Sequence, residues 1–89
     1  MNIFQEIKET IPLYDIAASY GIQLNRSNMC ACPFHEERTP SMKIHDKGFC
    51  CYGCGEHGDT IKFVQKLFGL ENPLDAAHKI NEDFHLGID

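Results

Sequence analysis

The chain has 89 residues, of which 43% are hydrophobic and 24% are charged, values that fit a small globular domain and exclude a disordered chain. A domain of this size buries only about 60% of its unfolded surface, so a metal ion or disulfides usually supplement its core. The net charge of -5 argues against nucleic-acid binding through a generally positive surface, although residues 26–66 are near neutral, with six basic and five acidic side chains. No signal peptide or membrane span is evident, so we expect a cytoplasmic protein with reduced thiols.

Two helices are expected in the first part of the chain. Ile3 and Ile7 share one face of a short helix over residues 3–9. Pro12 suits the first turn of a second helix, because the N–H group that proline lacks would have no partner there. That second helix is expected to end at about Tyr20.

Period-two alternation of apolar residues predicts a small sheet in the middle of the chain. Residues 22–24 are expected to form one strand, and residues 29–31 the next, with a polar turn between them. Residues 41–45 and 49–51 are expected to form a hairpin around the turn Asp46-Lys47-Gly48.

The helical period returns after residue 58. A helix is expected to begin at Asp59 or Thr60 and to end at Gly69, with an apolar stripe of Ile61, Val64, Leu67 and Phe68. Asn72 followed by Pro73 is typical of a helix start. The last helix is expected to bury Leu74, Ala77, Ile80 and Phe84.

Together these elements predict an α+β fold with a single domain over residues 1–89. Helices are expected at about 3–20 and 60–84. A small antiparallel sheet and a metal site are expected between them, at about 22–55.

Four cysteine and histidine residues have the spacing of a metal site. Two residues separate Cys32 from His35, two separate Cys51 from Cys54, and fifteen lie between the pairs. A two-residue gap lets a tight turn aim both ligands at one ion, and a hairpin between the pairs brings the two turns together. Three thiolates and one imidazole fill all four positions of a tetrahedron, so we expect one structural zinc ion rather than a catalytic one.

Other interpretations of the cysteines are weaker. Iron–sulfur clusters usually take four thiolates, disulfides need an oxidising compartment, and a redox role for Cys51 and Cys54 lacks its usual βαβ setting. Cys30 and Cys50 have no partner at the same spacing. We interpret them as small apolar side chains or free thiols on the sheet, because exchange with a neighbouring ligand would break the two-residue gap.

Two motifs, CPFHEERTPSMKI from Cys32 and CYGCGEHGDTIKFV from Cys51, closely resemble the N-terminal zinc-binding domain of bacterial DNA primases and of their phage and mobile-element relatives. The flanking stretches IPLYDIAASYGIQL and LFGLENPLDAAHKI resemble the segments that open and close that domain. The resemblance covers nearly all of residues 1–89. Cys50 and Tyr52 depart from it, since the family often has an aromatic residue or histidine at the first position and phenylalanine at the second.

The resemblance implies a zinc ribbon, which is an antiparallel sheet with a zinc ion at one end and helices around it. Its ligands would be Cys32, His35, Cys51 and Cys54. It also implies a zinc-dependent module of a DNA primase that binds single-stranded template DNA weakly and supports RNA primer synthesis in the primosome during replication. The implied partners are a primase catalytic core and a replicative helicase, with no membrane. Polymerisation is expected in a core that this chain lacks, so the chain is expected to be non-catalytic on its own.

Candidate template contacts lie in or beside the predicted hairpin: Arg38, Lys43, His45, Lys47 and Tyr52. Alternation places Lys43 and His45 on the face opposite to Met42 and Ile44. Basic side chains would pair with phosphates and Tyr52 would stack on a base. Solvation, or pairing with nearby acidic side chains, is the alternative for the basic residues.

Two further function classes are kept open. The acidic flanks and the missing core motivate a zinc-stabilised protein-interaction adaptor from a phage or mobile element, with no direct DNA contact. An enzyme that uses the metal or the Cys51–Cys54 pair is the other class, and a closed four-ligand site would exclude it.

Overall fold

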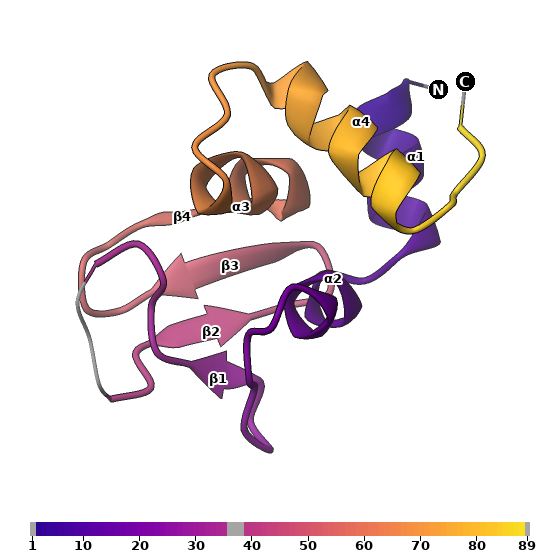
Figure 1. Cartoon of the computed structure of the whole chain (residues 1–89). Coiled ribbons are helices and arrows are strands. Elements are labelled where there is room, and N and C mark those ends of the chain that lie inside the picture. Colours follow the sequence, from indigo (N-terminus) through magenta and orange to yellow (C-terminus); the bar gives the residue numbers. More distant parts are fainter. Residues whose placement is uncertain (1, 36–38, 89) are drawn as a thin grey trace.

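The structure, a computed structural model, describes residues 2–35 and 39–88 as four helices and a four-stranded sheet (Figure 1). The elements in chain order are α1 (Ile3–Thr10), α2 (Leu13–Ser19), β1 (Met29–Cys30), β2 (Met42–Ile44), β3 (Gly48–Cys51), β4 (His57–Asp59), α3 (Thr60–Leu67) and α4 (Pro73–Asp83). The predicted α+β class, with helices before and after an antiparallel sheet, is confirmed. Within the described ranges, no helix has the length and apolar character that a bilayer crossing requires.

Side chains that precede the helices fix where three of them begin. Asn2 caps α1, Asp59 caps α3 and Asn72 caps α4, each by accepting a backbone N–H at 2.9 Å. Such a cap satisfies one of the N–H groups that lack a partner within the helix. Asp59 is therefore the cap of α3, and Pro73 takes the first position of α4 as expected.

The sheet is antiparallel throughout, in the order β1-β2-β3-β4. Cys30 pairs with Met42, and Met42 pairs with Cys51, so these three buried side chains form one row across the sheet. Ile44 is also buried on this face. Because successive side chains of a strand point to opposite faces, the residues between them face the other way.

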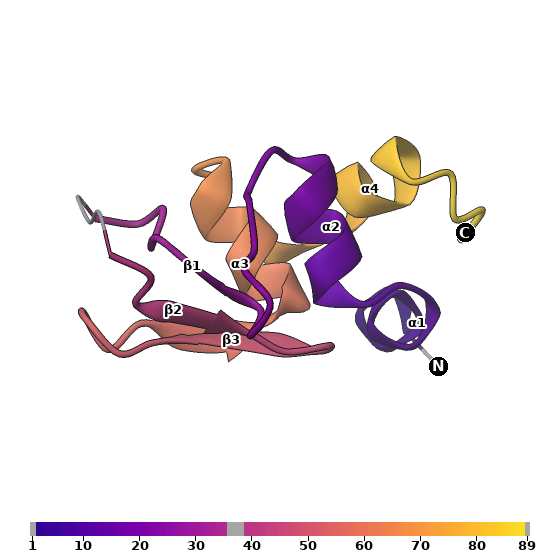
Figure 2. The ribbon, with the colours of Figure 1, turned by 90° about the horizontal axis from the view of Figure 1, so that it is seen from below.

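The helices cover one face of the sheet and leave the other open. Figure 2 shows α2, α3 and α4 on the same side of the strands, with α1 beside one end. α3 lies between the sheet and α4, in contact with β3, β4 and α4. The inward row of the sheet therefore belongs to the core, and the opposite row is not covered by a helix and is only partly buried.

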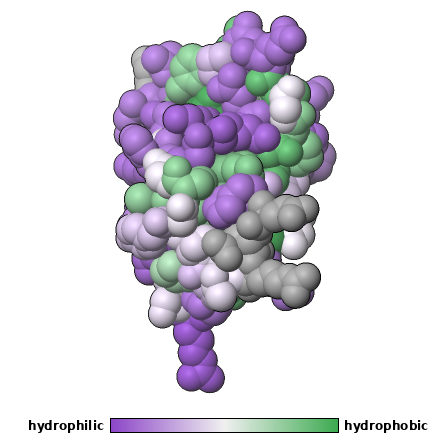
Figure 3. All heavy atoms as spheres, turned by 90° about the vertical axis from the view of Figure 1, so that its left-hand side faces the viewer, coloured by the Kyte–Doolittle hydropathy of each residue, from purple (hydrophilic) through white to green (hydrophobic). Residues whose placement is uncertain are grey.

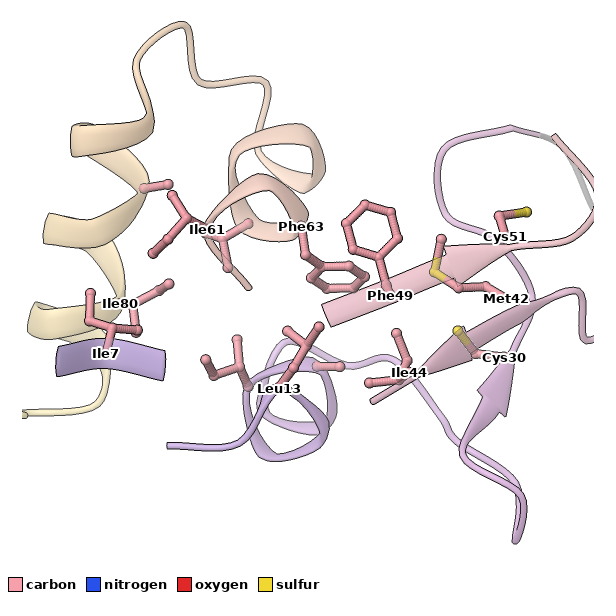
Figure 4. Close-up of a cluster of buried hydrophobic side chains, with 14 of the residues drawn as sticks. Ile7, Leu13, Cys30, Met42, Ile44, Phe49, Cys51, Ile61, Phe63 and Ile80 are labelled. Atoms are coloured by element: carbon pink, nitrogen blue, oxygen red, sulfur yellow. The ribbon is translucent and has the colours of Figure 1, made fainter. Parts of the chain in front are cut away.

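Aromatic rings join the sheet to α3. Phe34, Phe49 and Phe63 pack edge to face with ring centroids 5.4 to 5.6 Å apart. Figure 4 shows Phe63 reaching from α3 toward Phe49 on β3, and Ile7 of α1 beside Ile80 of α4. Edge-to-face pairs add about 0.5–1.5 kcal/mol beyond the burial of the rings, so this cluster is a main contact between sheet and helices.

A second aromatic group lies at the surface of the helices. The ring of Tyr20 is 4.8 Å from that of Phe68 and 5.6 Å from that of Phe84, centroid to centroid. The Tyr20 hydroxyl donates to Asp83 at 2.7 Å, and Lys79 Nζ lies 4.4 Å from the centroid of Phe68. This group ties α2 to α4 and to the end of α3.

The strand expected at residues 22–24 is absent. Ile22 N–H bonds back to Ala17 C=O at 3.0 Å, so the chain continues the end of α2 and does not pair with another strand. The alternation was nevertheless meaningful, since Ile22 and Leu24 both pack against the core.

Strand β4 is an addition to the predicted sheet. Its sequence, His57-Gly58-Asp59, has low β propensity, so pairing with β3 rather than intrinsic preference makes it a strand. Two glycines permit this pairing, because a Cβ on Gly48 would lie 2.6 Å from the carbonyl oxygen of Gly58.

The core differs from expectation at the two C-terminal helices. Phe63 is fully buried, whereas Phe68, expected in the apolar stripe, is 41% exposed because it lies beyond the last turn of α3. Leu74 was expected to be buried and is also 41% exposed; Ala76 lies in the core beside the expected Ala77 and Ile80.

Candidate metal centre and open sheet face

Four cysteine and histidine side chains converge at one end of the sheet. Cys32 and His35 lie in the turn after β1, Cys51 ends β3, and Cys54 lies in the turn that leads to β4. One ligand atom from each of them lies within 4.8 Å of all the others. Cys32 Sγ is 4.0 Å from Cys54 Sγ. Spacing in the sequence thus corresponds to proximity in the structure.

The donor set and its dimensions fit one structural zinc ion. A tetrahedral ion with Zn–S bonds of about 2.3 Å holds its sulfurs roughly 3.8 Å apart, close to the separation of Cys32 and Cys54. Three soft sulfur donors and one imidazole are typical zinc ligands. All four positions are filled by protein, so the arrangement leaves no position for a reacting water and fits a structural rather than a catalytic ion.

The turns that carry the ligands direct backbone N–H groups at the sulfurs. The N–H of Phe34 donates to the sulfur of Cys32, and the N–H of Cys54 donates to that of Cys51. Gly55 closes the second turn with a bond from its N–H to Cys51 C=O at 2.9 Å and has φ of +82°, which glycine adopts without strain. The two-residue gap between the ligands therefore serves two purposes: it places both ligands at one ion, and it lets a backbone N–H donate to the first sulfur of each pair.

The sulfurs differ in how readily they lose a proton. Burial raises the pKa of Cys32 to about 12. Burial also tends to raise the pKa of Cys51, but donors from the Cys54 N–H, the Ser41 hydroxyl and the neighbouring thiols lower it to about 6. Ser41 Oγ lies 3.7 Å from Cys51 Sγ. A divalent ion bound among the three sulfurs would favour the thiolate form of all of them.

Cys30 and Cys50 lie outside this four-residue cluster. Cys30 is buried on the inner face of the sheet, and burial, followed by the nearby Cys51, raises its pKa. Cys50 is half-buried on the opposite face, one residue from Cys51. Adjacent positions on a strand point to opposite faces, which keeps Cys50 away from the metal cluster.

The open face of the sheet carries a transverse row of polar side chains. Lys43 on β2 pairs with Cys50 on β3, and Cys50 pairs with His57 on β4. Lys43 is half-buried and donates to Ser27 C=O, whereas His57 is exposed and lies 3.1 Å from Gly55 C=O through Nδ1. The row ends beside the metal turns, so metal binding and this face share the same strands.

The structure separates the predicted template contacts into two groups. Tyr52 is 69% exposed, directly follows β3, and is bonded through its N–H to Ser41 C=O at 2.7 Å. His45 and Lys47 are exposed at the opposite end of the hairpin, in the β2–β3 turn. Arg38, the fifth candidate, lies outside the described residues. Lys43 and Tyr52 are therefore the candidates on or beside the open face, with Tyr52 next to the metal ligands and the Lys43 ammonium bonded to Ser27 C=O before β1.

His57, expected to be a cap or an exposed side chain in a turn, was not among the predicted template contacts because β4 was not expected. The sequence signal for it was the glycine-rich run after Cys54, which looked like a turn and not like a strand.

Figure 3 shows the surface at the metal end of the molecule, where hydrophobic patches lie among larger hydrophilic areas.

Comparison with known proteins places the geometry in a family. A family model described as CHC2 zinc finger matches residues 1–89. The DNA primase of Enterococcus faecalis is 35% identical over 93 residues, which cover 99% of this chain and 14% of that protein. The DNA primase of Helicobacter pylori is 38% identical over 100 residues, which cover 88% of this chain and 18% of that protein.

A solved structure, described as the Aquifex aeolicus primase with its zinc-binding and RNA polymerase domains, has the same fold. It superposes with a TM-score of 0.79 at 30% identity, covering 100% of this chain and 23% of that one. The chain thus spans a small part of the length of the curated relatives that it matches. From the whole-chain family match and these similarities, we conclude that the chain belongs to the CHC2 zinc finger family, the N-terminal zinc-binding domain of DNA primases.

Proposed function

We propose that the chain acts in DNA priming by binding single-stranded template DNA on the open face of its sheet, while Cys32, His35, Cys51 and Cys54 hold one structural zinc ion. The observation that carries this proposal is the uncovered sheet face beside a closed metal site, in a chain whose relatives are DNA primases. A closed site gives the ion no chemistry of its own. Its role is to hold two turns and the strands between them in fixed positions.

The charge distribution favours an approach of DNA from the sheet side. The acidic residues outside positions 26–66 number eight against two basic ones, and those on α4 lie on the helical side of the molecule. Lys43 and His57 lie on the opposite side. A polyanion is therefore repelled by the acidic surface of α4 and can contact Lys43 on the sheet.

Two side chains on or beside the open face would make different contacts with a DNA strand. Lys43 offers an ammonium group for a phosphate. Tyr52 offers an exposed ring on which a base stacks, a contact worth about 1–3 kcal/mol per base. Lys47 at the far turn would add a second positive charge and His45 beside it a polar contact, and Arg38 stays a candidate that lies outside the described residues. With one or two such contacts, binding is weak and depends on salt.

Primer synthesis would need a catalytic core in addition to this domain. The proposed partners are that core and a replicative helicase, in the cytoplasm, where primers are made. The domain would hold template while the core joins ribonucleotides.

The test is anisotropy of a labelled oligodeoxynucleotide titrated with the zinc-loaded chain at low salt. Lys43→Gln is expected to weaken binding roughly threefold or more and to lower the slope of log affinity against log salt by about 0.7. Tyr52→Ala should weaken it by roughly fivefold or more, through lost stacking. Lys79→Gln removes the same charge from α4 on the helical side and is the matched control. Absence of binding at low salt would contradict the proposal.

The adaptor interpretation is the second candidate. It is favoured by the acidic helical side, where Phe68 and Leu74 are each 41% exposed. Capture of a protein partner that Phe68→Ala abolishes, together with no template binding, would select the adaptor.

A further inference from the structure

A cleft lies between α1 and α3, apart from the metal centre. Its volume is about 520 Å³, within the range of about 300–1,000 Å³ typical of sites for small molecules. None of the four metal-cluster residues lines it. Its walls include Phe4, Lys8, Ile61, Lys62, Gln65 and Pro73.

The cleft concentrates positive charge on an otherwise acidic group of helices. Lys8 is paired with Asp59 at 3.0 Å, so these two charges offset each other. Within the described part of the chain, the ammonium of Lys62 has no ion pair. The net charge of the lining is therefore positive, while Glu9 on α1 and Glu82 on α4 are exposed acids. An anion is attracted to this cleft and repelled by the surfaces around it.

A glycine sets the path of the Lys62 side chain. A Cβ on Gly58 would lie 2.5 Å from Lys62 Cδ and 3.0 Å from Lys62 Cβ. The bare backbone of β4 at this point thus accommodates the aliphatic part of Lys62.

The remaining residues of the cleft suit a flat ligand group with an apolar face and polar edges. Phe4, Ile61 and Pro73 supply apolar wall. The side-chain amide of Gln5 donates to Glu9 at 3.2 Å, and that of Gln65 donates to Glu71 C=O at 3.3 Å. Each amide has a second N–H and a carbonyl oxygen left for the edge of a ligand.

We propose that this cleft binds a mononucleotide, with its base against Phe4 and Pro73 and its phosphates on Lys62. Lys8 adds a second contact to the phosphates when its ammonium leaves the ion pair with Asp59 and binds phosphate instead. A bare polyphosphate would contact the lysines but not the apolar residues of the cleft. A neutral nucleoside would contact the apolar residues but not the lysines. The ligand binds on a different face from the proposed template, and no covalent step occurs in the cleft.

The test is an amide NMR titration of the zinc-loaded 89-residue chain with magnesium ATP, tripolyphosphate and adenosine as probes. ATP is expected to shift the amides of α1 and of the first turn of α3, and to bind more tightly than either fragment. Lys62→Gln should weaken ATP binding about fivefold or more. Phe4→Leu keeps the wall apolar and should weaken it about threefold or more through lost stacking. Gly58→Ala displaces Lys62 without changing charge and should act in the same direction.

Lys66→Gln is the matched control, because Lys66 lies on the same helix but pairs with Glu56 outside the cleft. It should change ATP affinity less than about twofold. Three results would overturn the proposal: no shift in the cleft at about 10 mM ATP, tripolyphosphate binding as tightly as ATP, or equal effects of Lys62→Gln and Lys66→Gln. Template binding by the same variants is measured separately, so failure here leaves the sheet-face proposal intact.

Discussion

The metal end and the helical end of this molecule are stabilised by different kinds of contact. At the metal end, donor atoms within 4.8 Å of one another join two turns, and Gly53 and Cys54 in the second turn are exposed. At the helical end, α1 and α4 meet through buried side chains such as Ile7 and Ile80. One end therefore depends on a single ion, and the other on many small contributions. Four changes test this difference.

Removing zinc is expected to have the largest effect. Apparent binding energies of structural zinc in small domains are about 10–16 kcal/mol, so a chelator should unfold at least the sheet, and Cys51→Ser should do the same. Far-UV circular dichroism and dispersion of amide NMR signals measure the loss. Cys50→Ser, one residue away on the open face, is the control and should keep both zinc and fold. A native melting curve in the chelated chain would contradict the role given to the ion.

Truncating the aromatic contact between the two ends ranks second. Phe63→Ala should cost about 3–5 kcal/mol, because the ring is fully buried against Phe34 and Phe49. Phe68→Ala removes the same atoms from a ring that is 41% exposed, and should cost clearly less. Denaturant unfolding of the zinc-loaded variants separates the two, and equal costs would show that the core is not centred on Phe63.

Asp59 connects the ends, as the cap of α3 and the partner of Lys8, and Asp59→Ala should cost about 1–2 kcal/mol. Burial raises its pKa, but the Lys62 N–H and Lys8 lower it more, so the folded pKa lies below the ordinary value. The stabilisation is therefore complete above an ordinary carboxyl pKa of about 4 and is lost as the pH falls through the folded pKa. The melting-temperature gap between wild type and variant should stay constant from neutral pH to about 5 and then narrow. Asp75→Ala, in the first turn of α4, should show a much smaller gap.

The smallest effect is expected at Tyr20. Burial, then the hydrogen bond and charge of Asp83, raises the pKa of the Tyr20 phenol. This contribution is complete below the unfolded pKa of about 10 and is lost as the pH rises through the folded pKa. Tyr20→Phe should cost about 0.5–1.5 kcal/mol at neutral pH. Absorbance at alkaline pH, compared between the wild type and Tyr20→Phe, should show the Tyr20 phenol ionising above the ordinary range of a tyrosine; ionisation of Tyr20 at about pH 10 would contradict its hydrogen bond to Asp83.

Local signals in the sequence were sufficient for some of these features. The spacing of Cys32, His35, Cys51 and Cys54 predicts their convergence, because two-residue gaps and a hairpin fix geometry over short stretches. The start of α4 at Pro73 was predictable from Asn72, because its side chain caps the helix by accepting the N–H of Leu74, only two residues away.

Features that depend on distant partners were not predictable. Residues 22–24 alternate correctly but find no strand to pair with, and β4 exists because β3 lies beside it. Phe63 and Phe68 are equally apolar, and only the position of the sheet under α3 decides which is buried. The proposed template face shares this limit, since His57 joins it through β4.

The hairpin between the ligand pairs also governs how quickly the ion is captured. Fifteen residues separate His35 from Cys51, and closing such a loop costs conformational entropy that grows with the logarithm of its length. Formation of β2 and β3 shortens the effective loop before any metal arrives. Strand β4, which follows Cys54, then pairs with β3. The pairing brings Gly48 close to Gly58, since a Cβ on Gly48 would lie 2.6 Å from the carbonyl oxygen of Gly58. A side chain at Gly48, at the opposite end of β3 from Cys51, would therefore slow zinc uptake during refolding while leaving the donor atoms unchanged.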